Sequence, residues 1–206
     1  MAEAKTPVQS ESDLVAAAKK GDPDAFEALV VAHQDRVFGL CVRMIGHRED
    51  AEEVAASVFL SAFRALPRFR GECAFGTWLF RIAVNLSKNR LRTYARRPQP
   101  KSLDAPAHEG GDPPIGNLRS ERPGPDAVAE GAELSQRVEA SLLELSEEER
   151  EILLLRDGQG LDYPQIAAAL EIPEGTVKSR ISRARGALKA LLAPYLGPER
   201  KGKGGV

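Results

Sequence analysis

Seven of the fourteen prolines in this chain of 206 residues lie between residues 98 and 125, together with four glycines and few adjacent apolar residues. Such a segment cannot bury enough apolar surface to offset the conformational entropy that it would lose on folding. We expect it to be flexible, or to become ordered only on a partner. The sequence therefore predicts two folded units, residues 12–97 and residues 126–195, joined by a linker over residues 98–125.

Both units have the sequence pattern of helices. Aromatic residues make up only 5% of the chain, and Ala and Leu dominate its apolar residues, which favours helices over a β sandwich or barrel. Apolar residues recur at helical spacing between glycine and proline breaks. The expected helices of the first unit are residues 13–20 (capped by Ser12), 23–45 (after Asp22), 48–66 and, after a loop over residues 68–74, residues 75–95. Those of the second unit begin near residue 126 and continue over residues 147–157 (capped by Ser146), 163–170 (capped by Asp162) and 174–192. In the helix over residues 48–66, one apolar face is expected from Val54, Val58, Phe59, Ala62, Phe63 and Leu66. The predicted fold class is all-α, with two small helical domains and a helix-turn-helix in the second.

Several features argue against other classes of protein. The chain contains no run of eighteen apolar residues, and the polar residues 1–12 lack the apolar centre of a secretory signal. Two cysteines make neither a disulfide framework nor a zinc cluster, and three scattered histidines lack metal-ligand spacing. We therefore expect a cytoplasmic protein that is no enzyme, with no metal, no cofactor and no small-molecule substrate. His33 is expected on a solvated or half-buried helix face, Cys41 in the core and Cys73 in a loop.

The net charge of −1 conceals a strong segregation of charge along the chain. Residues 64–97 carry nine Lys and Arg against one Asp or Glu, and residues 176–206 carry eight against one. Residues 98–175 between them carry six basic and seventeen acidic residues, and residues 1–63 carry six and eleven. Two basic blocks separated by an acidic one are consistent with nucleic-acid binding, although the total charge is close to zero.

The segment Tyr163–Arg185 has the pattern of a helix-turn-helix. Two short helices are joined by a three-residue turn, and the second carries short polar and basic side chains near its beginning. A recognition helix needs such side chains to reach base edges and phosphates in the major groove. For Arg180 and Arg185 a second interpretation stays open, in which they pair with acidic residues of the preceding helices.

Basic and aromatic residues alternate through residues 64–97, as in proteins that hold single-stranded or flipped bases. Helical spacing favours a core position for Phe75 and Trp78, whereas Phe69 lies in a predicted loop and is the better candidate for a base contact. Asn85 lies among apolar residues of the predicted helix. It either satisfies backbone groups locally or reads a base edge, and the sequence does not favour one over the other.

Taken together, these motifs resemble the extracytoplasmic-function (ECF) group of bacterial sigma factors. In the first unit the resemblance rests on Asp24–Leu29, Arg48–Val54, Phe69–Gly71 and Thr77–Asn85. In the second unit it rests on Leu145–Ser146, Glu149–Arg150, Tyr163–Ala167 and Gly175–Arg185. The segment Thr77–Asn85 and the long linker are similar to the envelope-stress branch of the family.

The resemblance implies roles for individual residues. Recognition of the −10 promoter element and capture of a flipped base would fall to Phe69, Arg70, Gly71, Asn85, Lys88 and Arg92. Recognition of the −35 element would fall to Thr176, Lys178, Ser179, Ser182 and Arg183. Docking on core RNA polymerase would fall to Asp50, Glu53, Val54 and Ser57. The implied partners are core RNA polymerase, promoter DNA and an anti-sigma factor that is often membrane-bound in the family. The linker would pass through the polymerase cleft.

Two departures from the family pattern limit what the resemblance implies. Where relatives often carry Gln-Glu in the docking helix, this chain has Ala56 and Ser57, and Ser182 stands where some relatives carry an aromatic residue. Polymerase binding is therefore expected to be weaker or to use other residues, and the −35 sequence preference does not transfer. The alternative function is an ordinary helix-turn-helix regulator, which would bind duplex DNA without polymerase.

Overall fold

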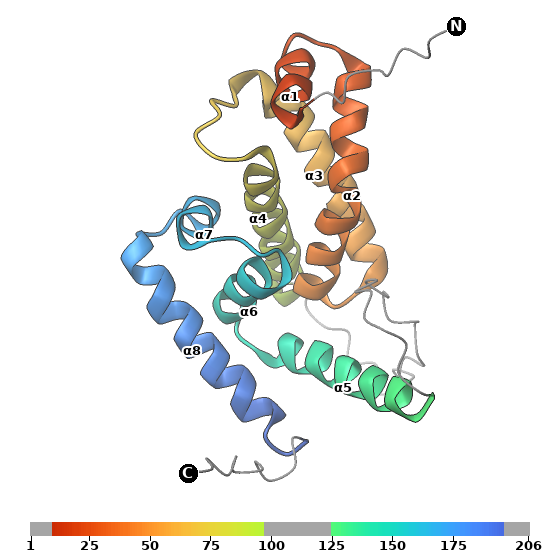
Figure 1. Ribbon diagram of the computed structural model, residues 1–206, viewed down its shortest axis with the longest axis vertical. Helices are drawn as coiled ribbons and strands as arrows, with labels where there is room; N and C mark the ends of the chain where they lie inside the picture. The colour runs from red at the N-terminus through yellow and green to blue at the C-terminus, as the bar shows by residue number, and fades with distance from the viewer. Residues whose placement is uncertain (1–9, 97–124, 196–206) are drawn as a thin grey trace, which may run out of the picture.

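The computed structural model describes residues 10–96 and 125–195. Nearly all of the predicted linker (residues 98–125) and the Gly- and Lys-rich residues 198–206 lie outside these ranges. Within them the chain forms helices and no strands, as the sequence predicts. The two helical units lie side by side, and α4 runs along the boundary between them (Figure 1). None of these helices combines the length and apolar character that crossing a membrane requires.

The first unit consists of α1 (Glu11–Lys19), α2 (Pro23–Ile45), α3 (Arg48–Ala65) and α4 (Phe75–Arg96), with a 3-10 turn over Leu66–Arg68. The cap of α1 is Ser10, not the predicted Ser12, because Ser10 and Asp13 form a capping box with each other's backbone amides. The ends of α2 follow the prediction: Asp22 caps its beginning, and Gly46 ends it with a left-handed φ of 80°.

The core of the first unit is formed where α2, α3 and α4 pack together. One stripe of each helix is fully buried, including Leu40 in α2, Val58 in α3 and Leu79 in α4. Phe75 and Trp78 are buried as expected. The predicted apolar face of α3 is only partly correct, because Phe63 at its edge is 52% exposed.

The second unit consists of α5 (Pro125–Glu144), α6 (Glu147–Leu153), α7 (Tyr163–Leu170) and α8 (Glu174–Leu192). The predicted capping boxes are confirmed at α6, through Ser146 and Glu149, and at α7, through Asp162 and Gln165. The predicted helix 147–157 changes to a π-helical turn over Leu154–Gly158, so that the α-helix ends earlier than expected.

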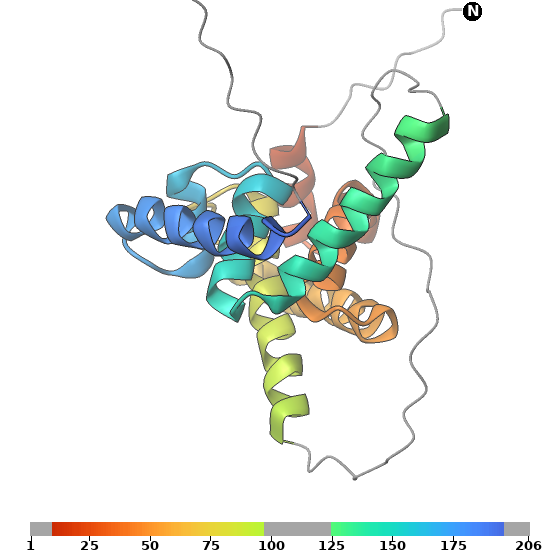
Figure 2. The ribbon, with the colours of Figure 1, turned by 90° about the horizontal axis from the view of Figure 1, so that it is seen from below.

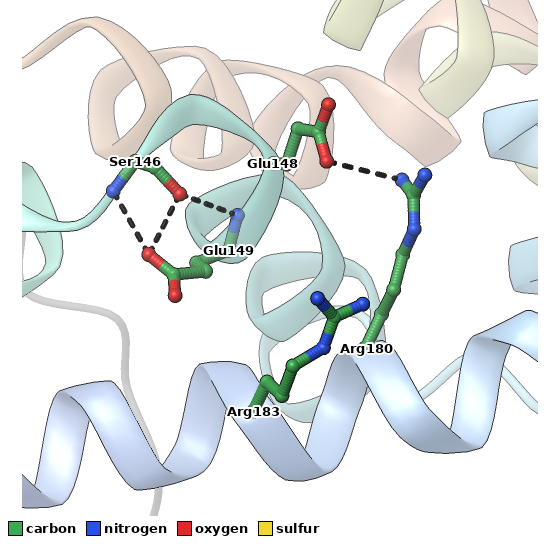
Figure 3. Close-up of a pocket in the computed structure, with 5 residues that line it drawn as sticks. All are labelled: Ser146, Glu148, Glu149, Arg180 and Arg183. Atoms are coloured by element: carbon green, nitrogen blue, oxygen red, sulfur yellow. Dashed lines mark hydrogen bonds and ion pairs between the residues drawn. The ribbon is translucent and has the colours of Figure 1, made fainter.

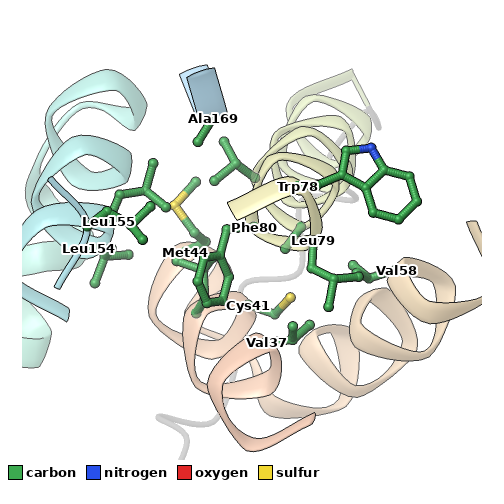
Figure 4. Close-up of a cluster of buried hydrophobic side chains, with 14 of the residues drawn as sticks. Val37, Cys41, Met44, Val58, Trp78, Leu79, Phe80, Leu154, Leu155 and Ala169 are labelled. Carbon is green, nitrogen blue, oxygen red and sulfur yellow. The ribbon is translucent and has the colours of Figure 1, made fainter. Parts of the chain in front are cut away.

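The two units share a continuous apolar core. Figure 4 shows Leu154, Leu155 and Ala169 of the second unit beside Phe80 and Met44 of the first. Each of these side chains is at most 4% exposed. The two units therefore form one packed body across residues that are far apart in the sequence.

Polar contacts reinforce this packing. Arg150 of α6 is buried and donates one hydrogen bond to the Met44 carbonyl at the end of α2, at 2.5 Å. Its other nitrogens donate to three carbonyls between α5 and α6, those of Leu142, Leu143 and Leu145. Figure 2 shows that the last turns of α4 extend past the other helices, so that only its first part is covered by the second unit.

Candidate nucleic-acid and polymerase interface

The predicted recognition helix, α8, has one buried and one exposed face. Val177, Ile181 and Ala184 lie in the core, one helical turn apart. The opposite face exposes four of the predicted −35 residues: Lys178, Ser179, Ser182 and Arg183. Thr176, the fifth, is half-buried, and its carbonyl accepts a hydrogen bond from the Ser179 hydroxyl at 2.9 Å. The structure therefore places four of the five predicted −35 residues on one exposed face of α8.

Two further arginines of α8 are engaged inside the second unit. The Arg180 guanidinium lies 3.6 Å from the Glu148 carboxylate, and the Arg185 guanidinium makes a bidentate contact with the Asp157 carboxylate. This outcome favours the interpretation in which these arginines pair with acidic residues of the preceding helices. A guanidinium paired in this way must exchange its carboxylate for a phosphate before it can bind DNA.

A small pocket of about 150 Å³ separates α8 from the beginning of α6. It is lined by Ser146, Glu148, Glu149, Arg180 and Arg183. Figure 3 shows the Arg183 side chain pointing from α8 towards α6, while Glu149 is held by the capping box and Glu148 by Arg180. In this conformation Arg183 faces the acidic edge of the second unit itself.

Four polar side chains form a stripe along α4, at positions 81, 85, 88 and 92. Residues at these spacings lie on one face of a helix. Asn85 and Arg92 are exposed, and the Asn85 side chain makes no hydrogen bond with other residues of the described ranges. The structure therefore gives no support to the interpretation in which Asn85 satisfies backbone groups locally. Arg81, which the sequence analysis did not select, lies one turn before Asn85 on the same stripe.

The second unit contacts two members of this stripe. Lys88 donates to Glu151 at 2.8 Å, and Arg81 donates to Glu171 at 3.2 Å. Lys88 is thus engaged across the boundary between the units, and is not a free cation on the surface.

In the loop between α3 and α4, the polar residues are exposed and the aromatic residue is partly buried. Arg70 is exposed, and Gly71 adopts a left-handed φ of 74° that other residues rarely take. Phe69 is half-buried, with its ring 4.8 Å from Trp78 and 6.0 Å from Phe75 between centroids. The loop is further fixed by Lys19, which donates to the Phe69 carbonyl at 2.7 Å. Phe69 therefore belongs to an aromatic cluster with Phe75 and Trp78 and keeps part of its surface exposed.

The predicted polymerase-docking residues of α3 separate into different environments. Glu53 and Ser57 are exposed one turn apart. Arg90 of α4 donates hydrogen bonds to both Glu53 and Asp50, the latter at 3.0 Å. Val54 is only 4% exposed, because its side chain is packed in the core, so it presents little surface for the predicted contact with polymerase.

The exposed face of α3 also carries an apolar patch that the sequence analysis missed. Leu60 is 51% exposed and Phe63 52%, three residues apart and beyond Ser57 on the same helix. The Phe63 ring meets Phe26 of α2 edge-to-face, with 5.0 Å between the ring centroids. Large exposed apolar side chains that gather on one face are typical of protein interaction sites.

One histidine and the two cysteines occupy structural positions. His33 is buried, not on a solvated or half-buried face as expected, and its Nε2 lies 3.5 Å from a carboxylate oxygen of Glu11 in α1. Cys41 lies in the core, where burial raises the pKa of its thiol to about 11, and Cys73 lies in the loop. In the described part of the chain, no three His, Cys, Asp or Glu residues gather in a way that would hold a metal ion.

The burial of His33 predicts a pH dependence of stability. Burial lowers the pKa of His33, although Glu11 opposes that shift and Arg36 adds to it. The unfolded chain therefore takes up a proton at higher pH than the folded one. The stability that the neutral imidazole contributes is present above its ordinary pKa of about 6.5 and is lost as the pH falls through the folded value. Urea unfolding at pH 7 and pH 5 should show a smaller loss of stability for His33→Leu than for the unmodified chain. An equal loss in both proteins would contradict this role.

Both units match families of known proteins, and the whole chain has close relatives. Residues 29–97 match the Sigma-70 region 2 family, and residues 135–188 match the Sigma-70 region 4 family. The chain is 38% identical over 190 residues to the RNA polymerase sigma-H factor of Pseudomonas aeruginosa, covering 91% of this chain and 96% of the relative. It is 40% identical over 183 residues to the ECF RNA polymerase sigma-E factor of Escherichia coli K12, covering 89% and 94%.

Solved structures show the same fold. The structure of CnrH in complex with the cytosolic domain of CnrY matches with a TM-score of 0.65 and 27% identity, over 90% of this chain and 99% of that one. The sigma factor RpoE of Bartonella quintana, solved with the anti-sigma factor NepR, matches with a TM-score of 0.60 and 22% identity, over 82% and 96%.

Proposed function

Since the chain belongs to the ECF group of sigma factors, which are non-catalytic subunits for transcription initiation, we propose that it directs core RNA polymerase to promoters of a stress-type regulon. In this proposal residues 12–97 bind polymerase and the −10 element, residues 126–195 bind the −35 element, and residues 98–125 connect them. The observation that carries it is the pair of polar and basic helix faces, on α4 and on α8. The similarity of Thr77–Asn85 to the envelope-stress branch supports a regulon of this type, and the sigma-E and sigma-H names of the relatives fit a stress response.

At the −35 element, α8 would enter the major groove. Lys178, Ser179 and Ser182 would face the DNA, with Thr176 near the beginning of the helix and Arg183 at its side. Short hydroxyl side chains allow a close approach of the helix, and the cations neutralise phosphates. Arg183 would leave the pocket beside α6 to join this contact.

At the −10 element, the loop Phe69–Gly71 and the stripe of α4 would hold the melted strand and a flipped base. We expect Asn85→Ala to impair open-complex formation more than the initial binding of duplex promoter, because the amide would pair with a base edge only after that base leaves the stack. Permanganate reactivity of the melted region and a gel-shift assay of the closed complex measure the two steps. Asn89→Ala, also on α4 and exposed, is the matched control. Equal losses in both steps would contradict a pocket role.

On polymerase, the exposed face of α3 would provide the docking surface, with Glu53 and Ser57 beside the apolar patch of Leu60 and Phe63. In this chain the patch would compensate for the absence of Gln-Glu at positions 56 and 57. We expect Phe63→Asp to weaken binding to core polymerase at least about tenfold, because a central apolar anchor commonly contributes more than 1–2 kcal/mol to an interface.

The control for this docking surface is Val31→Asp, which changes another exposed apolar residue, on α2, that is 61% exposed. Fluorescence anisotropy of the labelled protein titrated with core polymerase measures both affinities. Equal effects of the two changes would show that the patch has no special role in docking.

An anti-sigma factor is the proposed negative regulator. The support is that CnrH, a relative with 27% identity over nearly its whole length, was solved in complex with the cytosolic domain of another protein. Purification of the tagged chain from its native cell would test this proposal directly, with a chain lacking residues 126–206 as the comparison.

The proposed function is tested by run-off transcription. The purified chain with core polymerase should produce discrete transcripts from a library of genomic fragments, and polymerase alone should not. Failure to initiate from any fragment would exclude the function. An ordinary helix-turn-helix regulator would instead footprint duplex DNA without polymerase and leave run-off synthesis dependent on another sigma factor.

A further inference from the structure

Under the proposed function, on which this inference rests, the stripe of α4 at positions 81, 85, 88 and 92 faces the melted promoter strand. Two of its members are cations that lie under the second unit, and Asn85 lies between them along the helix.

Glu151 of α6 covers Lys88. The ammonium group donates to the carboxylate at 2.8 Å, and the side chains are 22% and 3% exposed, respectively. Burial raises the pKa of Glu151, while the hydrogen bond from Lys88 and its charge oppose that shift; Glu148 and Arg180 are the other charged groups that act on it. A carboxylate this deeply buried is stable only with a cationic partner, so α6 and α4 depend on each other at this point.

Glu171 covers Arg81 two turns earlier along α4. It ends α7 in the left-handed conformation, with a φ of 55°, and its carboxylate accepts from Arg81 at 3.2 Å. The pair is exposed, with side chains 69% and 37% accessible, so it contributes little to stability on its own. The position of this pair is informative, because Glu171 and Glu151 lie over the two cations that flank Asn85 along α4.

Other contacts hold the second unit in this place. Arg36 of α2 donates to the Gln159 carbonyl at 2.9 Å, and Arg150 donates to the Met44 carbonyl. Together with the apolar contact around Phe80, they keep Glu151 and Glu171 over the cations without using those cations themselves.

We propose that the second unit is an autoinhibitory cover on the first, in which Glu151 and Glu171 occupy the places of nucleic-acid phosphates on α4. Carboxylates and phosphate oxygens accept the same charge-assisted hydrogen bonds from Lys and Arg. A DNA strand on the stripe and the closed arrangement of the two units therefore exclude each other. By reciprocity, anything that separates the units strengthens binding of the strand, and the strand favours separation.

The test uses the full chain with Glu151→Gln and Glu171→Gln together. A fluorescent ten-nucleotide single strand of random sequence serves as the probe. The double variant is expected to bind it about fivefold or more tightly than the unmodified chain, because a competing conformation is weakened. The matched control, Glu144→Gln with Glu174→Gln, removes two exposed acids of the second unit and should stay within about twofold.

A second measurement follows the separation itself. Dyes at Ala56→Cys in α3 and Ala190→Cys in α8, both exposed, report the distance between the units in a Cys73→Ser background. Cys41 is buried and stays unlabelled. The energy transfer should fall in the double variant, and it should also fall when the single strand saturates the otherwise unmodified chain. Because Glu151 is buried, Glu171→Gln alone serves as the milder variant, with smaller changes in the same direction.

The proposal is overturned if the double variant binds the strand no more tightly than the unmodified chain, or if saturation with the strand leaves the energy transfer unchanged. Circular dichroism confirms that each variant is folded. Run-off transcription separates this proposal from the proposed function. If the chain initiates transcription but the affinity for the strand and the distance between the units do not change, the autoinhibitory cover is excluded and the proposed function still holds.

Discussion

Replacement of Arg150 by leucine is expected to lower the free energy of unfolding by more than about 3 kcal/mol, because several buried carbonyls lose their donor at once. Arg150 is 7% exposed and donates to four carbonyl oxygens, three at the turn between α5 and α6 and one at the end of α2. Burial lowers the pKa of Arg150, yet a guanidinium stays charged at any pH at which the protein is folded. Leucine cannot replace any of these hydrogen bonds.

Urea unfolding measures this effect with two probes. Trp78 is the only tryptophan and reports on the first unit, whereas circular dichroism reports on both. Because Arg150 joins the units, both transitions should move to lower urea concentration. Arg180→Ala is the control, since this arginine makes only a surface pair with Glu148 and should cost less than about 1 kcal/mol. A loss below 1 kcal/mol for Arg150→Leu would contradict the role of its hydrogen bonds.

Replacement of Phe80 by alanine is expected to cost about 3–5 kcal/mol, the usual range for a phenylalanine removed from a packed core. Phe80 is 1% exposed, and Arg36 lies over its ring at 5.0 Å from the centroid. Its ring lies among side chains of both units, so the cavity would open at their boundary (Figure 4). Thermal unfolding followed by circular dichroism measures the loss.

The comparison for Phe80 is Phe63→Ala. Phe63 is 52% exposed, and its removal should change the stability by less than about 1 kcal/mol. In the proposed function it should instead weaken polymerase binding. A similar loss of stability from both substitutions would show that the boundary between the units is no better packed than the surface of α3.

Much of the fold follows from local rules. The breaks at Gly46 and the caps at Asp22, Ser146 and Asp162 occur where the sequence predicts them, because a cap depends on side chains within three or four residues. The same local rules leave small errors at other ends. Ser10 and Ser12 are both able to cap α1, and only Ser10 has Asp13 at the third position of the helix that it opens.

The candidate site was predictable to a smaller extent. The exposed face of α8 follows from helical periodicity, since Val177, Ile181 and Ala184 mark the buried side. Whether a polar residue of such a face is free depends on neighbours that are distant in the sequence. Lys88 and its partner Glu151 are 63 residues apart, and no spacing rule connects them. The burial of His33 against α1 and the core position of Val54 have the same kind of cause.

The sequence by itself determined the helices, most of their ends, the helix-turn-helix and the two basic segments, because these depend on backbone preferences and periodicity over short distances. Only the tertiary structure decided which charges are free and which are paired, and that the second unit rests on α4. The physical reason is that electrostatic and packing energies depend on distance in space. Helices from both units bring Arg81, Lys88 and Arg150 to partners that their own segments of the chain do not contain.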